Sequence, residues 1–186
     1  MRRGRIEILD TRLLTEATYK ELRDATRNDD RHRRGIEQGY SCKLRGYKDG
    51  KLIFSCHSNP TKGHSGKTHK WWTQKVELID LPELLEDDEL SDREKVAYAI
   101  QGDIRVDCTC PDDTYSGAAY RRQKLNPSAT MVKEPIEAPT RKKNIESKAL
   151  LCKHLDVVLY ALPFNVGKIT KVLKQNGVFD KDEDEE

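Results

Sequence analysis

The chain has 186 residues, of which 35% are hydrophobic and another 35% are charged, so it has the size of one domain with a small hydrophobic core. Its formal net charge of +2 argues against a dedicated nucleic-acid binder, although that charge is compatible with a local basic patch. No stretch approaches the roughly 20 apolar residues of a membrane-spanning helix, and the N-terminal MRRGRIEILDTR lacks the apolar segment of a secretory signal. We therefore expect a protein that is not exported, whose five cysteines stay reduced and form no disulfides.

Charge is segregated along the chain. Acidic residues dominate 77–94 and the C-terminal DKDEDEE, whereas basic residues dominate 117–151. Blocks of like charge are typical of solvated or flexible segments and of docking surfaces.

The first part of the chain shows a helical pattern and then a strand pattern. Residues 12–34 are predicted to form a helix with a narrow apolar stripe and a capping box between Thr18 and Glu21. Residues 41–58 predict a β-hairpin, because Asp49-Gly50 is a favoured two-residue turn between two alternating segments.

Further strands and a loop are expected in the middle of the chain. Residues 71–81 predict a third strand that ends at an acidic linker, and Ser91 begins a second capping box and a helix through Ile100. Residues 103–108 predict another strand. Residues 114–148 have few apolar side chains, several prolines and many bases, so we expect a long basic loop there.

Two helices are predicted at the C-terminal end. Residues 152–162 carry an apolar stripe with helical spacing, and residues 166–175 form a shorter helix that Gly177 ends. The expected fold class is α+β, with a small antiparallel sheet packed on the 152–162 helix, one structural zinc site and long extended arms. The chain divides into four segments: an N-terminal helical arm (1–38), a hairpin and third-strand region with an acidic linker (39–90), a zinc module with the basic loop (91–163), and a C-terminal helix with an acidic tail (164–186).

The sequence VDCTCPDD, residues 106–113, places two cysteines one residue apart. A disulfide between Cys108 and Cys110 would need strained geometry, so a shared metal ion is the better explanation. The partners expected for it are Cys152 and His154, at the start of the clearest helix. Three thiolates and one imidazole suit tetrahedral Zn²⁺.

Backbone geometry restricts how these four side chains can converge. Residues two apart on a strand point to opposite faces, so the chain must turn at Cys108 and Cys110, as Pro111 favours. Residues two apart on a helix diverge by about 200°, so Cys152 should precede the first turn and His154 should lie within it. Four protein ligands leave no open position for a water molecule, so the zinc is expected to be structural and the protein not to be an enzyme.

The order strand, C-x-C-P, variable loop, C-x-H and amphipathic helix resembles the SWIM zinc-finger pattern. The segments DIRVDCTCPDDTY (103–115) and LCKHL (151–155) are most similar to SWIM-like proteins encoded among the virion structural genes of tailed bacteriophages. The resemblance covers roughly residues 92–162. It implies that Cys108, Cys110, Cys152 and His154 bind one Zn²⁺, and that the protein acts in the virion, or in the host cytoplasm during assembly.

Three other motifs could form sites. GHSGKT, residues 63–68, resembles a phosphate-binding loop but has Thr61 where the full pattern needs glycine. A Cys152–His154 nucleophile pair lacks a third residue to orient it. A second metal site is open to Cys42, Cys56, His57, His64 and His69, although Cys42 should lie opposite His57 with Cys56 on the other face of the hairpin.

Two functions follow from these observations. The first is a non-enzymatic virion structural or assembly protein that contacts neighbouring virion proteins, which suits a small core with charged extensions. The alternative is a zinc-stabilised nucleic-acid-binding module. Trp71-Trp72 with Lys70 and Lys75 could also stack bases, although more often one such tryptophan lies in the core and its neighbour is a packed edge or contact residue. The phosphate contacts of the alternative would come from Arg121, Arg122, Lys124, Arg141, Lys142 and Lys143.

Overall fold

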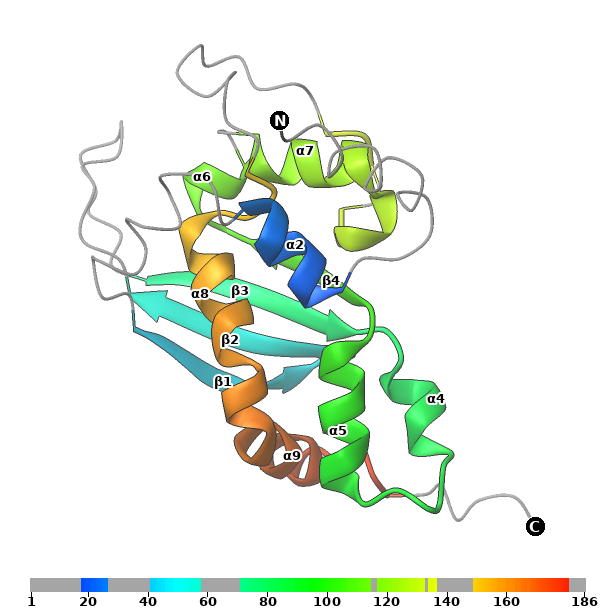
Figure 1. Ribbon diagram of the computed structural model, residues 1–186. Helices are drawn as coiled ribbons and strands as arrows, with labels where there is room; N and C mark the ends of the chain where they lie inside the picture. Colours follow the sequence, from blue (N-terminus) through cyan, green and yellow to red (C-terminus); the bar gives the residue numbers. More distant parts are fainter. Residues whose placement is uncertain are drawn as a thin grey trace.

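A four-stranded antiparallel sheet forms the centre of the fold, in the order β1-β2-β3-β4 (Figure 1). The computed structural model describes residues 18–26, 41–57, 71–114, 117–132, 134–136 and 149–180. The expected α+β class with a small antiparallel sheet is confirmed. The strands are β1 (Cys42–Lys48), β2 (Lys51–His57), β3 (Trp71–Leu78) and β4 (Ile104–Cys108).

Helices cover one face of this sheet, with α8 crossing the strands and α2 and α5 beside it (Figure 1). None of the helices in the described ranges is long and apolar enough to cross a bilayer. The α-helices are α2 (Tyr19–Thr26), α4 (Leu81–Leu85), α5 (Asp92–Gln101), α6 (Pro111–Thr114), α7 (Ala118–Leu125), α8 (Lys153–Ala161) and α9 (Val166–Gln175), and the 3-10 helices are η1 (Pro127–Ala129) and η3 (Pro163–Asn165).

Both predicted capping boxes are present. The Glu94 backbone N–H donates to the Ser91 hydroxyl, and the Glu94 carboxylate accepts from the Ser91 backbone, which starts α5. Thr18 and Glu21 exchange the same pair of bonds at the start of α2. The structure describes only residues 18–26 of the helix expected over 12–34, and the rest of that prediction lies outside the described residues.

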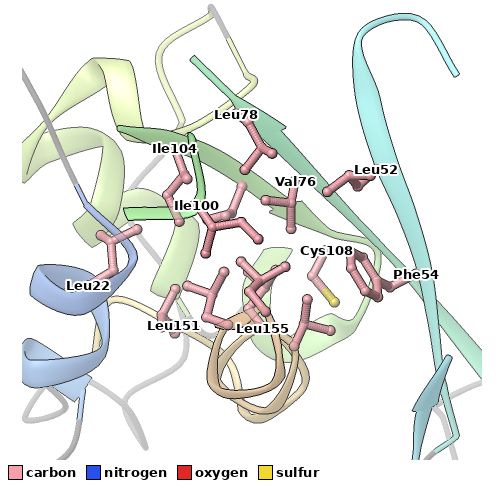
Figure 2. Close-up of a cluster of buried hydrophobic side chains, with 14 of the residues drawn as sticks. Leu22, Leu52, Phe54, Val76, Leu78, Ile100, Ile104, Cys108, Leu151 and Leu155 are labelled. Atoms are coloured by element: carbon pink, nitrogen blue, oxygen red, sulfur yellow. The ribbon is translucent and has the colours of Figure 1, made fainter. Parts of the chain in front are cut away.

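The core lies between the sheet and the helices. The apolar stripe of α8 is fully buried, and the inward side chains of β2, β3 and β4 meet it (Figure 2). Leu22 joins the same cluster, so the described part of the N-terminal segment packs into the core. The buried stripe of α8 consists of Leu155, Val158 and Leu159, with Leu162 just after the helix.

The β1–β2 hairpin turns where it was predicted to turn, but its register differs from the expected one. Asp49 and Gly50 both have positive φ, at 50° and 74°, as a tight two-residue turn requires. A β-bulge between Leu44 and Gly46 then shifts the pairing by one residue. Cys42 therefore faces Cys56, and the predicted pairing of Cys42 with His57 is wrong.

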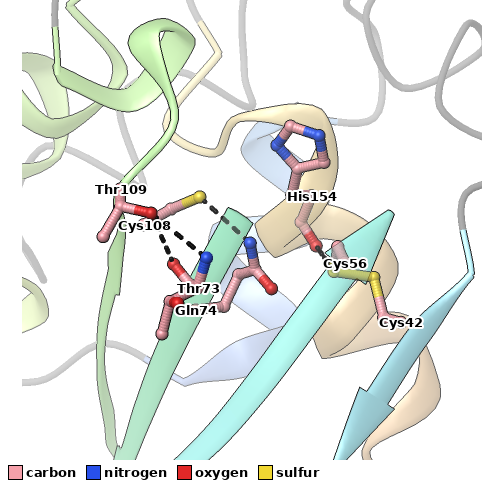
Figure 3. Close-up of a disulfide and its surroundings, with 7 residues drawn as sticks. All are labelled: Cys42, Cys56, Thr73, Gln74, Cys108, Thr109 and His154. Carbon is pink, nitrogen blue, oxygen red and sulfur yellow. Dashed lines mark hydrogen bonds between the residues drawn. A yellow bond between two sulfur atoms is a disulfide. The ribbon is translucent and has the colours of Figure 1, made fainter. Parts of the chain in front are cut away.

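That register brings Cys42 and Cys56 together in a disulfide (Figure 3). The expectation that no disulfide would form is therefore wrong for this pair. It was based on the expected compartment, whereas the bond follows from a cross-strand contact that only the bulge creates.

Thiol counting checks this bond directly. Protein that is denatured at lysis in the presence of a metal chelator and an alkylating reagent should carry three alkylated thiols per chain, which are Cys108, Cys110 and Cys152. Cys42→Ala should lower the free energy of unfolding by roughly 2–4 kcal/mol, because the unfolded chain loses a cross-link. Treatment with reductant before alkylation serves as the control and should give five thiols. Five thiols without reductant would contradict the disulfide.

The basic loop expected over 114–148 is not a loop in its described first half. Helix α7 and the 3-10 helix η1 occupy most of residues 118–129, and α7 buries Ala118, Ala119 and Arg122. A helix is predicted from an apolar stripe with helical spacing, and α7 has none. It packs instead through a buried arginine and two alanines. Residues 137–148 lie outside the described part of the chain.

Candidate metal centre

Three segments bring the four predicted ligands together. Cys108 ends β4, and Cys110 lies immediately before α6, which begins at Pro111. Cys152 is the N-cap of α8, with an extended backbone at φ −73° and ψ 162°, and His154 lies in the first turn. The turn after β4 and the position of Cys152 before the helix agree with the geometry that the spacing predicts.

The four side chains form a buried cluster that could hold a metal ion. One ligand atom from each residue lies within 4.8 Å of each of the others. All four residues are 2% exposed or less. Sulfur atoms bound to tetrahedral zinc at 2.3 Å lie about 3.8 Å apart, so small side-chain adjustments would close the cluster on an ion.

Two N–H groups donate to the sulfur atoms. The Gln74 side-chain amide donates to the Cys108 Sγ at 3.3 Å, and the Asp113 backbone N–H donates to the Cys110 Sγ at 3.4 Å. Figure 3 shows Gln74 pointing from β3 towards Cys108. Donors of this kind favour the thiolate over the thiol and orient the ligand.

The thiols of the cluster shift one another's pKa values. Hydrogen bonding to Cys108 and Cys152, together with burial, raises the pKa of Cys110 well above its ordinary value. Burial and hydrogen bonding to Cys108 likewise raise the pKa of Cys152. Burial opposes ionisation of Cys108 as well, but hydrogen bonds from Cys110, Cys152 and Gln74 outweigh it and hold the pKa of Cys108 well below its ordinary value. Three thiolates this close need a positive charge among them, which a divalent cation would supply.

A fully buried arginine connects the segments that carry the ligands. The two terminal nitrogens of Arg122 donate to the two carboxylate oxygens of Asp113 at 3.1 and 2.9 Å. The same nitrogens donate to the backbone carbonyls of Leu150, at 2.8 Å, and Val106, at 3.3 Å. Arg122 thus bridges β4, α6 and the chain just before Cys152.

Burial and the arginine act in opposite directions on Asp113. Desolvation raises the pKa of this carboxyl to about 6, and the charge of Arg122 limits the rise. The pair is 2.9 Å apart with both side chains at most 1% exposed. A bidentate pair of this kind fixes the relative orientation of α6 and α7.

The described basic residues among those expected to contact nucleic acid differ in exposure. Arg122 is fully buried, so the prediction that it contacts phosphate is wrong. Arg121 is half-buried and its Nε donates to the Ala149 carbonyl at 2.8 Å, whereas Lys124 is exposed on α7. Arg141, Lys142 and Lys143 lie outside the described residues.

No second group of three or more metal-binding side chains occurs among the residues that the structure describes. The disulfide occupies both Cys42 and Cys56, which removes them as ligands for a second metal. His57 packs edge-on against Trp71. His64 and His69, together with the phosphate-loop resemblance over 63–68, lie outside the described residues.

The sequence did not indicate the roles of Gln74, Asp113 and Arg122 around the cluster. Gln74 occupies an inward position of a strand, which strand alternation alone could have indicated. Asp113 and Arg122 give no comparable signal, because an arginine in a basic segment normally lies at the surface.

Comparison with known protein families, with curated proteins and with solved structures finds no match to this chain.

Proposed function

We propose that the chain is a non-enzymatic protein whose fold is held by one structural Zn²⁺, bound by Cys108, Cys110, Cys152 and His154. The observation that carries the proposal is the convergence of three sulfur atoms and one imidazole in a buried cluster within 4.8 Å. Thiolate-rich sites of four protein ligands are typical of structural zinc.

The surroundings of the cluster support a structural role. A catalytic zinc needs a position open to water or substrate, whereas all four ligand residues are buried. The ligands also join segments far apart in the sequence, at β4–α6 and at the start of α8. Zinc would neutralise the thiolates and hold these segments together, with Gln74 and the Asp113 backbone as hydrogen-bond donors to the sulfur atoms.

The proposal extends to assembly. The module serves as a structural or assembly protein of a tailed-bacteriophage virion, in contact with neighbouring virion proteins. This part rests on the resemblance of the C-x-C-P and C-x-H segments to SWIM-like virion proteins. Peptide mass spectrometry of purified virions should then find the chain at a constant copy number, and its absence from mature particles and assembly intermediates would overturn this part alone.

Metal content tests the zinc site. Elemental mass spectrometry of purified protein should find one zinc per chain, and Cys152→Ala should bind less than a tenth as much, because three ligands hold zinc far more weakly than four. Cys42→Ala is the matched control, since it removes a cysteine from the disulfide only and should keep one zinc. Folded wild-type protein without zinc, or full zinc in Cys152→Ala, would contradict the assignment.

A further inference from the structure

The face of the sheet opposite α8 carries polar and basic side chains. Buried and half-buried residues alternate along β2, β3 and β4, as in a sheet with one face on the core and the other towards solvent. In the described part of the chain, helix α8 and its apolar stripe pack on the core face. The outward positions of β2 and β3 include Lys51, Ile53, Lys75 and Glu77, which alternate with the buried Leu52, Phe54 and Val76.

Positive charge on this face is concentrated on the β1–β2 hairpin. Residues 42–57 contain four basic residues and a single acid, Asp49 in the turn. On the same face, the charges of β3 and β4 are balanced. Arg105 pairs with Glu77 at 3.4 Å, and Lys75 lies opposite Asp107 in the register. The basic residues of the hairpin are Lys43, Arg45, Lys48 and Lys51.

An exposed aromatic ring lies beside these charges. Trp71, at the start of β3, is 44% exposed, and its ring contacts His57 edge-on at 5.0 Å between centroids. The Arg45 guanidinium carbon lies 5.4 Å from the Trp71 ring centroid. Arg45 is the extra residue of the β-bulge, so the same irregularity that pairs Cys42 with Cys56 places this guanidinium next to the ring.

Cations beside an exposed indole fit one class of partner best. An acidic protein would match the charges but would not need the ring, and a duplex keeps its bases stacked inside the helix. Single-stranded nucleic acid offers both phosphates for the lysines and unpaired bases for the indole.

We propose that the outer sheet face formed by Lys43, Arg45, Lys48, Lys51 and Trp71, here called the hairpin face, binds single-stranded nucleic acid. The lysines contact phosphates, and one base stacks on Trp71 beside the Arg45 guanidinium. The hairpin face is distinct from the basic segment 117–151 and does not depend on the proposed zinc function.

Fluorescence anisotropy with labelled 20-mers of dT and rU tests this binding on the full chain, from low to physiological salt. Wild type should bind both strands, and the logarithm of affinity should fall with the logarithm of salt by about 0.7 per phosphate contact. Lys43→Glu with Lys48→Glu should weaken binding at least about tenfold and reduce the salt slope by about 1.4, for two lost contacts.

Two further comparisons separate stacking from charge. Trp71→Ala should weaken binding about tenfold at unchanged net charge, whereas Trp71→Phe should retain most of the affinity because a ring remains. The matched charge control is Lys168→Glu with Lys171→Glu, both exposed on α9, which should change affinity less than twofold. Thermal melts establish that each variant is folded.

Several results would overturn the proposal. These are no binding by wild type at low salt, an equal loss in the α9 control, or unchanged affinity in Trp71→Ala. Binding of a 20-base-pair duplex as tight as that of single strands would also overturn it, as would equally effective competition by polyglutamate, which would indicate an acidic protein partner.

Discussion

Removal of the proposed zinc with a chelator is expected to abolish the cooperative unfolding transition of this protein. Structural zinc contributes roughly 10–16 kcal/mol of apparent binding free energy in small domains, and the total stability of a domain is only about 5–15 kcal/mol. The proposed ligands join β4 to the start of α8, whose apolar stripe packs in the core, so loss of the metal is expected to release this helix from the sheet. Scanning calorimetry and near-ultraviolet circular dichroism, before and after metal removal, measure the effect.

Two controls make this result specific to zinc. A chelator saturated with zinc in advance should leave the melt unchanged, and adding back one equivalent of zinc should restore it. Elemental mass spectrometry confirms that the metal has left. A metal-free protein that still melts cooperatively at the original temperature would show that the cluster does not hold the fold.

Replacing the buried arginine is expected to have the next largest effect. Arg122→Met should lower the free energy of unfolding by about 3–5 kcal/mol, because it leaves the Asp113 carboxylate buried without its partner. The variant also removes the donors to the Leu150 and Val106 carbonyls. Urea denaturation of zinc-loaded protein measures the loss.

The neighbouring Arg121 offers a matched control. Arg121→Met removes the same charge from α7, but the side chain is half-buried, so the loss should be about 1 kcal/mol. Zinc affinity distinguishes the two variants further, and Arg122→Met should weaken it about 10- to 100-fold, as changes around metal ligands do. Equal stability of the two variants would contradict the role assigned to Arg122.

Local patterns predicted much of this molecule. The capping boxes at Thr18 and Ser91, the Asp49-Gly50 turn and the helix over 166–175 depend on neighbours a few residues apart, and the structure contains each of them. The ligand cluster was predictable for a related reason. It consists of two pairs of residues, Cys108 with Cys110 and Cys152 with His154. Whether the two side chains of a pair can converge depends on the local backbone conformation alone.

The features that were missed depend on contacts across the fold. The hairpin register changed because of a bulge at Arg45, a residue whose type gives no sign of one, and the disulfide followed from that change. The sequence predicts a loop where α7 lies, because the main buried anchor of that helix is Arg122 and charge normally marks a surface. Only the assembled structure shows that Asp113 and two carbonyls surround that guanidinium.

The hydrogen bonds of Arg122 and the ligand cluster also hold together the two ends of the chain segment that runs from Cys110 to Cys152. Once the ends of a chain segment are held together, doubling its length costs only about 0.6 kcal/mol of closure entropy. Thr130 pairs with β4, and Val132, Glu134 and Ile136 bond to Gln123 of α7. Insertions after Ile136 should therefore leave the sheet and its helices intact, provided that residues 149–151 still reach the arginine. The part of this segment after Ile136 is thus a place where a foreign peptide can be grafted at low cost to folding.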